Sequence, residues 1–195
     1  MTARIAPVQP PLTLFQRFAY WITRRQYGVV LTPMQVIYAR KPRFAFLAQH
    51  IGSTLDGGLS LDDDLVVLAT SRVAQVNGCA FCQDFALAKS IQKRLGADRF
   101  AALADYAASL LFSERERAAL AFCERASREH AVDDETFEKV RAHFSETEVI
   151  ELAWIAAAET YFNIQAGVLR LGSDGLAERA AEAHGVTSRL LPDAA

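Results

Sequence analysis

Apolar residues recur every three or four positions along almost all of this 195-residue chain, and no segment alternates polar and apolar residues over several positions. A period of 3.6 residues is typical of amphipathic helices, whereas a half-buried strand has a period of two. Two Ser-x-x-Glu sequences, at Ser113–Glu116 and Ser145–Glu148, add the hydrogen-bonding pattern of a helix N-terminus. The sequence therefore predicts an all-α fold, arranged as a single-domain helical bundle.

Breaks in the helical pattern divide the chain into four parts. Residues 1–11, with three prolines, are expected to form an irregular N-terminal arm, and residues 12–38 an N-terminal helical extension. Residues 39–175 are the main helical domain, and residues 176–195 a charged, alanine-rich C-terminal tail. Ser60 is the expected N-cap of a helix over 60–76. Further helices are predicted at 12–27, in two short pieces within 33–55, and at 79–95, 97–110, 113–130, 133–143 and 145–171.

Composition and cysteine content restrict the class of protein. The chain has no apolar run near the ~18–20 uncharged residues of a membrane span, and its first residues lack the order of a signal peptide. Three cysteines do not make the disulfide framework of a small secreted domain. The sequence therefore predicts a cytoplasmic protein with no stable membrane insertion.

Charge is distributed unevenly along the chain. The first 55 residues contain seven basic and no acidic side chains, whereas the other 14 basic and all 23 acidic residues follow. Because the basic residues are dispersed among aromatic ones, we expect this segment to pack on its own body or on a neighbouring subunit, and we expect no nucleic-acid binding. The helix over 12–27 offers a contact surface for assembly, or alternatively for a membrane surface, made of Leu14, Phe15, Phe18, Tyr20, Trp21 and Ile22.

The chemically most informative stretch is Cys79-Ala80-Phe81-Cys82, which follows a helix break at Asn77-Gly78. Two thiols three positions apart on a helix lie on one face and can exchange a disulfide. Cys79 is expected in the first turn of that helix, where unpaired N–H groups stabilise a thiolate. A thioredoxin carries its CxxC after a strand, whereas a helix precedes this one. Dithiol redox chemistry on a helical scaffold is therefore the first hypothesis.

The cysteine pair belongs to a longer string over residues 71–84, SRVAQVNGCAFCQD, in which an apolar helix, an Asn-Gly turn, CxxC and an aspartate follow one another. Two further segments lie downstream, FSERERAAL at 112–120 and FSETEVIEL at 144–152, with Asn163 beyond them. Together these segments, over residues 39–171, resemble the carboxymuconolactone decarboxylase and alkylhydroperoxidase D superfamily.

The resemblance implies a fold, an assembly and an activity. It implies an all-helical protein that forms homo-oligomers, commonly trimers or hexamers, and that acts as a thiol-dependent peroxidase. We expect no cofactor and no metal. By motif position, Cys82 attacks the peroxide and Cys79 then closes a disulfide, which a dithiol electron donor such as a lipoylated protein reopens. A disulfide is the alternative substrate. The helix N-terminus taken alone favours Cys79 as the more acidic thiol, but the roles assigned here follow the family.

The sequence departs from the peroxidase branch at two positions that handle protons. That branch has a histidine four residues after the second cysteine and a glutamate twelve residues before the first, and here these positions are Ala86 and Val67. General acid–base help of this kind is worth about 10²–10⁴-fold. The nearest acidic residues are Asp84, expected at the surface or as a cap, and the cluster at 62–64. The four histidines, expected to be solvated or structural, are His50, His130, His143 and His184.

Glu159 and Cys123 are two further residues with expected roles. Glu159 lies in a nearly apolar helix and must find a partner or titrate, an arginine across a subunit contact being the expected partner. Cys123 lies on an apolar stripe and is expected to be an inert core thiol.

A zinc site at the CxxC would need a second close pair of ligands. A lactone decarboxylase typically lacks the CxxC. The non-enzymatic alternative is a helical oligomer whose CxxC forms a regulatory or structural disulfide.

Overall fold

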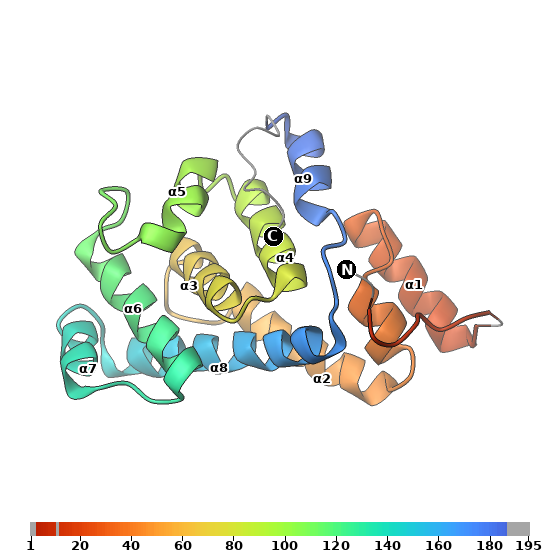
Figure 1. Cartoon of the computed structure of the whole chain (residues 1–195), viewed down its shortest axis with the longest axis horizontal. Helices are drawn as coiled ribbons and strands as arrows, with labels where there is room; N and C mark the ends of the chain where they lie inside the picture. The colour runs from red at the N-terminus through yellow and green to blue at the C-terminus, as the bar shows by residue number, and fades with distance from the viewer. Residues whose placement is uncertain (1–2, 11, 187–195) are drawn as a thin grey trace.

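Helices make up the regular structure of the protein, as the sequence predicts. The computed structural model describes residues 3–10 and 12–186, and over these ranges it contains helices and no strand (Figure 1). The α-helices are α1 (Leu14–Tyr27), α2 (Pro42–Asp56), α3 (Asp63–Val76), α4 (Ala80–Gln92), α5 (Ala97–Ala101), α6 (Glu114–Glu129), α7 (Asp134–Arg141), α8 (Glu146–Leu169) and α9 (Leu176–His184). A π-helix, η1 (Met34–Tyr38), and a 3₁₀-helix, η2 (Ala102–Asp105), complete the set. The all-α prediction is confirmed.

Side-chain caps fix where the main helices begin. Ser113 and Ser145 each accept a hydrogen bond from the N–H three residues on, and the Glu116 and Glu148 carboxylates accept from the N–H of that serine. Both predicted capping boxes are thus confirmed. A third box, formed by Thr13 and Gln16 at the start of α1, was not predicted. Each box satisfies donors that a helix N-terminus would otherwise leave unpaired.

Two helix boundaries differ from the prediction. The helix expected over 60–76 begins at Asp63, and Ser60 instead donates its N–H and hydroxyl to the Glu151 carboxylate of α8, at 2.8 and 2.9 Å. A carboxylate from another helix therefore satisfies the donors that precede α3. The helix expected over 97–110 is only α5 followed by η2, because its last apolar residue, Leu110, is 97% exposed and adds nothing to the core.

Helix α3 lies at the centre of the molecule and packs against α4, α6 and α8 (Figure 1). The largest core cluster joins α3, α6, α7 and α8 through side chains such as Val73, Phe122 and Leu152. A second cluster joins α4 and α5 to α9, which packs along α4. Residues 176–184 of the expected C-terminal tail therefore form α9, and residues 187–195 of that tail lie outside the described ranges.

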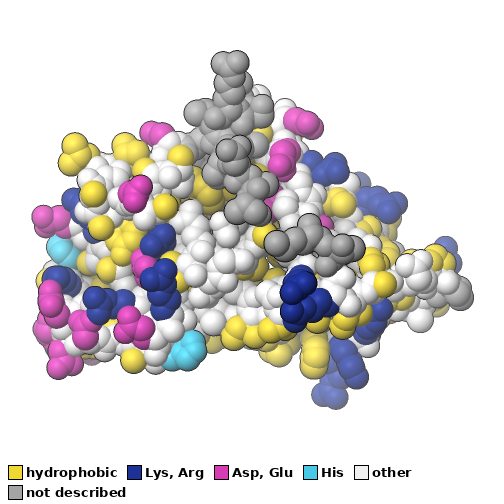
Figure 2. Space-filling model, in the orientation of Figure 1, with side chains coloured by type: hydrophobic (Ala, Val, Ile, Leu, Met, Phe, Trp, Pro, Cys, Tyr) yellow, Lys and Arg dark blue, Asp and Glu magenta, His cyan; other side chains and the backbone are white. Residues whose placement is uncertain are grey.

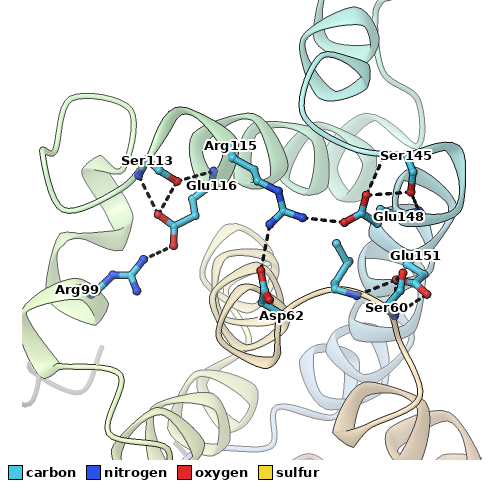
Figure 3. A network of polar contacts seen from close by, with 10 residues as sticks. Ser60, Asp62, Arg99, Ser113, Arg115, Glu116, Ser145, Glu148 and Glu151 are labelled. Atoms are coloured by element: carbon cyan, nitrogen blue, oxygen red, sulfur yellow. Dashed lines mark hydrogen bonds and ion pairs between the residues drawn. The ribbon is translucent and has the colours of Figure 1, made fainter.

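A polar network ties together the N-terminal ends of α3, α6 and α8 (Figure 3). Arg115 contacts Glu148 at 2.7 Å and Asp62 at 3.2 Å, while Arg99 pairs with Glu116. Because these pairs are partly exposed, each contributes at most about 1 kcal/mol to stability. A pocket of about 500 Å³ lies among these residues, and apart from Leu65 and Ser113 it is lined by charged side chains that form ion pairs or face solvent.

The N-terminal arm and η1 lie against the end of α8. The Arg4 N–H donates to the Leu169 carbonyl oxygen at 2.9 Å, and the Val8 N–H donates to the Gln35 carbonyl oxygen at 3.1 Å. Over α1 and α2, basic side chains lie among exposed hydrophobic ones, whereas acidic and basic side chains mix near α7 (Figure 2). In the described residues, no helix is long and apolar enough to cross a membrane.

Candidate redox site

Cys79 and Cys82 are joined by a disulfide, with their Cα atoms 5.2 Å apart. Cys79 is the N-cap of α4, one residue before the first turn in which it was expected, and its sulfur accepts the Cys82 N–H at 3.2 Å. The break that allows this geometry is Gly78, whose φ of 63° lies in the left-handed region that favours glycine. The first sulfur therefore occupies the position at a helix start where negative charge is stabilised.

Both sulfurs lie in an apolar pocket of the core. Cys79 is 2% exposed and Cys82 6% exposed. Around them pack Ala3 of the arm and residues from α3, η1, α4, the C-terminal end of α8 and the segment just after it: Val36, Ile37, Ala74, Phe81, Phe162, Ala166, Leu169 and Leu171. Ala3 of the arm, η1 and the end of α8 therefore form part of the wall around the cysteine pair.

The two positions at which the family's peroxidases carry proton-handling groups are apolar and buried. Val67 of α3 is buried in the core, and Ala86 of α4 packs against α9. All four histidines are exposed, as expected for solvated side chains. Asp62 and Asp63 are exposed and pair with Arg115 and Lys93.

Asp84 is a cap, which is one of its two predicted roles. Its side chain is 8% exposed and accepts hydrogen bonds from Ser173 Oγ and from the N–H groups of Asp174, Leu176 and Ala177, at 2.8 to 3.0 Å. These donors lead into α9 and include its first two N–H groups. Asp84 therefore fixes the start of α9 rather than serving the sulfurs.

Glu159 finds its partner within the same helix, so the expectation of an arginine across a subunit contact is not needed to explain it. The Asn163 amide donates to Glu159 Oε1 at 2.6 Å, and Asn163 Oδ1 accepts from the Asn77 amide at 2.9 Å. Burial raises the pKa of Glu159 to about 7, although the Asn163 hydrogen bond and the charge of Lys89 act to lower it. This chain of three residues ends two positions before Cys79.

Sequence reasoning singled out Glu159 but did not connect it to the cysteine pair. Asn77 and Asn163 were named only as parts of the segments that resemble the superfamily. Their contact spans 86 residues, so local patterns do not reveal it. The i, i+4 spacing of Glu159 and Asn163 on one helix was the signal available in the sequence.

The third cysteine, Cys123, lies in the core. Cys123 is fully buried, as predicted for a core thiol, and burial raises its pKa to about 12. Its Sγ lies 3.5 Å from the Leu152 carbonyl oxygen. Among residues 3–10 and 12–186, no three His, Cys, Asp or Glu side chains gather as a metal-binding group.

Comparisons with known proteins agree with this architecture. The family model of the carboxymuconolactone decarboxylase family matches residues 44–125. The uncharacterized protein YnjA of Escherichia coli (strain K12) is 35% identical over 148 residues, which cover 73% of this chain and 81% of YnjA.

Solved structures extend the likeness to nearly the whole chain. A protein of unknown function from Agrobacterium tumefaciens, ATU0492, for which the role of the antioxidant defence protein AhpD has been suggested, superposes with a TM-score of 0.65 at 25% identity, covering 71% of this chain and 96% of its own. The debrominase Bmp8, in complex with 2,3,4-tribromopyrrole, superposes with a TM-score of 0.77 at 18% identity, covering 94% and 98%. The second likeness concerns the fold alone. With the family match and the identity to YnjA, the chain belongs to the carboxymuconolactone decarboxylase and AhpD-like superfamily and carries a CxxC pair.

Proposed function

We propose that the protein is a thiol-dependent oxidoreductase that uses Cys79 and Cys82 to reduce a peroxide or a disulfide. The observation that carries this proposal is the Cys79–Cys82 disulfide at the start of α4, with the Cys79 sulfur accepting a helix N–H. Family membership and the antioxidant role suggested for ATU0492 support it. The fold's use by a debrominase indicates that the scaffold serves several reactions, so the peroxide step needs its own test.

The proposed cycle balances without a cofactor. The Cys82 thiolate attacks one peroxide oxygen, an S–O bond forms as the O–O bond breaks, and the alcohol or water leaves with a proton. Cys79 then displaces hydroxide from the sulfenic acid of Cys82, so that the disulfide and one water form. An external dithiol, such as a lipoyl group on a partner protein, returns two electrons and two protons through a mixed disulfide. We propose that this takes place in the cytoplasm and in a homo-oligomer.

The apolar Val67 and Ala86 favour a second candidate, a redox sensor whose disulfide controls a protein contact without turnover. With neither proton-handling group in place, the peroxide step would lack its usual acid–base assistance. A sensor needs only slow, reversible closure of the disulfide. The two candidates therefore differ in rate rather than in the bond that forms.

Stopped-flow consumption of hydrogen peroxide and of an organic peroxide, with simultaneous counting of free thiols, tests the proposal. We expect the reduced protein to lose two thiols per peroxide and Cys82→Ser to consume none. Cys123→Ala is the matched control, because it removes the third thiol and leaves the pair intact. If both thiols of the pair persist for minutes, the peroxidase proposal is wrong. Cycling with dithiols alone would then indicate disulfide exchange or sensing.

A further inference from the structure

A continuous line of hydrogen bonds joins a buried carboxyl group to the turn that carries Cys79. Glu159 Oε1 accepts from Asn163, whose Oδ1 accepts from Asn77 Nδ2, and Asn77 also donates to Thr160 Oγ1 at 3.3 Å. Asn77 is the C-cap of α3, and only Gly78 separates it from Cys79. The order of donors is fixed along the line. Because Asn163 must donate to the carboxyl group, its oxygen is left to hold Asn77.

The same face of α8 reaches the sulfurs directly. Glu159, Asn163 and Ala166 recur at helical spacing and are all buried, and Ala166 packs in the apolar pocket around Cys79 and Cys82. The carboxyl group and the cysteine pair therefore border one stripe of α8 and share the interior between α3, α4 and α8. In such an interior, charges interact more strongly than they do in water.

The basic groups of α3 and α4 are engaged with carboxylates of their own. Among the described residues, Lys89 of α4 is the basic group that bears on the pKa of Glu159, and it pairs with Asp56 of α2. Arg72 of α3 pairs with Glu124 of α6 at 2.8 Å. Glu159, 9% exposed, is thus held by an amide rather than by a cation. Ionisation of Glu159 therefore adds an unpaired negative charge to the interior that it shares with the sulfurs.

We propose that Glu159 is a positioning residue for the cysteine pair. It orients the Asn163–Asn77 line that holds the Asn77–Gly78 turn, and its ionisation disfavours the thiolate form of the reduced pair. The proposal rests on the proposed function only in that the pair cycles between disulfide and dithiol. Reduction by an external dithiol leaves two protein thiols and one donor disulfide, with two electrons and two protons transferred. The thiolate that forms during this exchange is destabilised when the Glu159 carboxylate is ionised, because two negative charges then share one apolar interior.

The pH dependence of thiol reactivity tests this proposal. The reduced protein is treated with iodoacetamide from about pH 5 to about pH 9, and alkylation of Cys79 and Cys82 is followed by peptide mass spectrometry. Because two interacting groups titrate in coupled steps, the wild-type profile is expected to show two inflections, one near the pKa of Glu159. In Glu159→Gln the acceptor remains but the charge is gone. We expect a single inflection and, above pH 7, at least about threefold faster alkylation, equivalent to about half a pKa unit.

Two further variants separate charge from orientation. Glu146→Gln removes an exposed carboxylate from the same helix and is expected to leave the profile unchanged. Asn163→Leu removes the hydrogen bond that lowers the pKa of Glu159, so the extra inflection is expected to move to higher pH. A Glu159→Gln profile that superposes on wild type would overturn the proposal. Alkylation needs no peroxide. A protein that fails to consume peroxide can therefore still show the effect of Glu159 on alkylation, so the two failures are distinguishable.

Discussion

The carboxylate of Asp84 accepts four hydrogen bonds from the residues that lead into α9, and it supplies their main polar anchor on α4. Replacement by alanine leaves buried N–H groups without acceptors, which typically costs about 1–3 kcal/mol for each group that water cannot reach. We therefore expect Asp84→Ala to lower the free energy of unfolding by roughly 2–3 kcal/mol, measured by urea denaturation.

The matched control for this prediction lies on α9 itself. Glu182 is exposed near the end of that helix, so Glu182→Ala is expected to change stability by less than about 0.5 kcal/mol. Asp84→Asn keeps one acceptor oxygen, so its loss of stability is expected to lie between those of Glu182→Ala and Asp84→Ala. Equal stability of wild type and Asp84→Ala would contradict the capping role.

Residue-scale features divide into those that local sequence predicts and those that it does not. The capping boxes at Ser113 and Ser145 were predictable because a serine and a glutamate three positions apart contain all of the geometry. The prediction of Ser60 as an N-cap is wrong because its N–H and hydroxyl donate to Glu151, which lies 91 residues away in the sequence. The CxxC could be recognised from neighbouring residues alone, whereas the Asn77–Asn163 contact beside it joins residues that are 86 positions apart.

At the scale of elements, the arm and the π-helix η1 cover the buried disulfide. The arm is fastened by the Arg4 and Val8 N–H groups and by Arg40, which donates to the Ala6 and Val36 carbonyl oxygens at 2.8 and 2.7 Å. Few of these contacts bury apolar surface, so local opening should cost much less than global unfolding. The arm is therefore the element most able to expose the pair without loss of the core.

Removal of the arm through Pro10 is expected to speed reduction of the disulfide by dithiothreitol on the order of tenfold, the equivalent of ~1.4 kcal/mol of opening free energy. The rate is measured by quenched alkylation over time. Arg40→Ala, which loosens the arm without shortening the chain, should give a smaller increase in the same direction. Unchanged rates in both variants, with unchanged melting temperature, would mean that the arm does not limit access.

At the scale of the whole molecule, the surface formed by the first 55 residues has no carboxylate partner for its basic side chains and leaves apolar side chains exposed in the part of the chain that the structure describes. Leu14, Phe18 and Trp21 of α1 and Phe46 of α2 are exposed. In residues 3–10 and 12–186, none of the basic side chains before residue 56 forms an ion pair with a carboxylate, while the acidic residues all lie at residue 56 or later. A second copy of the chain offers both a carboxylate-rich surface and an apolar one.

This distribution predicts a homo-oligomer whose contact includes α1. Light scattering coupled to size-exclusion chromatography should give a mass that is a multiple of 21.5 kDa, three or six by family resemblance. Trp21→Glu buries a charge in that contact and should shift the protein to a lower mass, because an unpaired charge in an apolar contact costs several kcal/mol.

Leu110→Glu, at an exposed position outside α1 and α2, is the control and should leave the mass unchanged. High salt should weaken an assembly held partly by charge. A wild-type mass of one chain at micromolar concentration would contradict the prediction, and the exposed aromatic face of α1 would then have to serve a different partner.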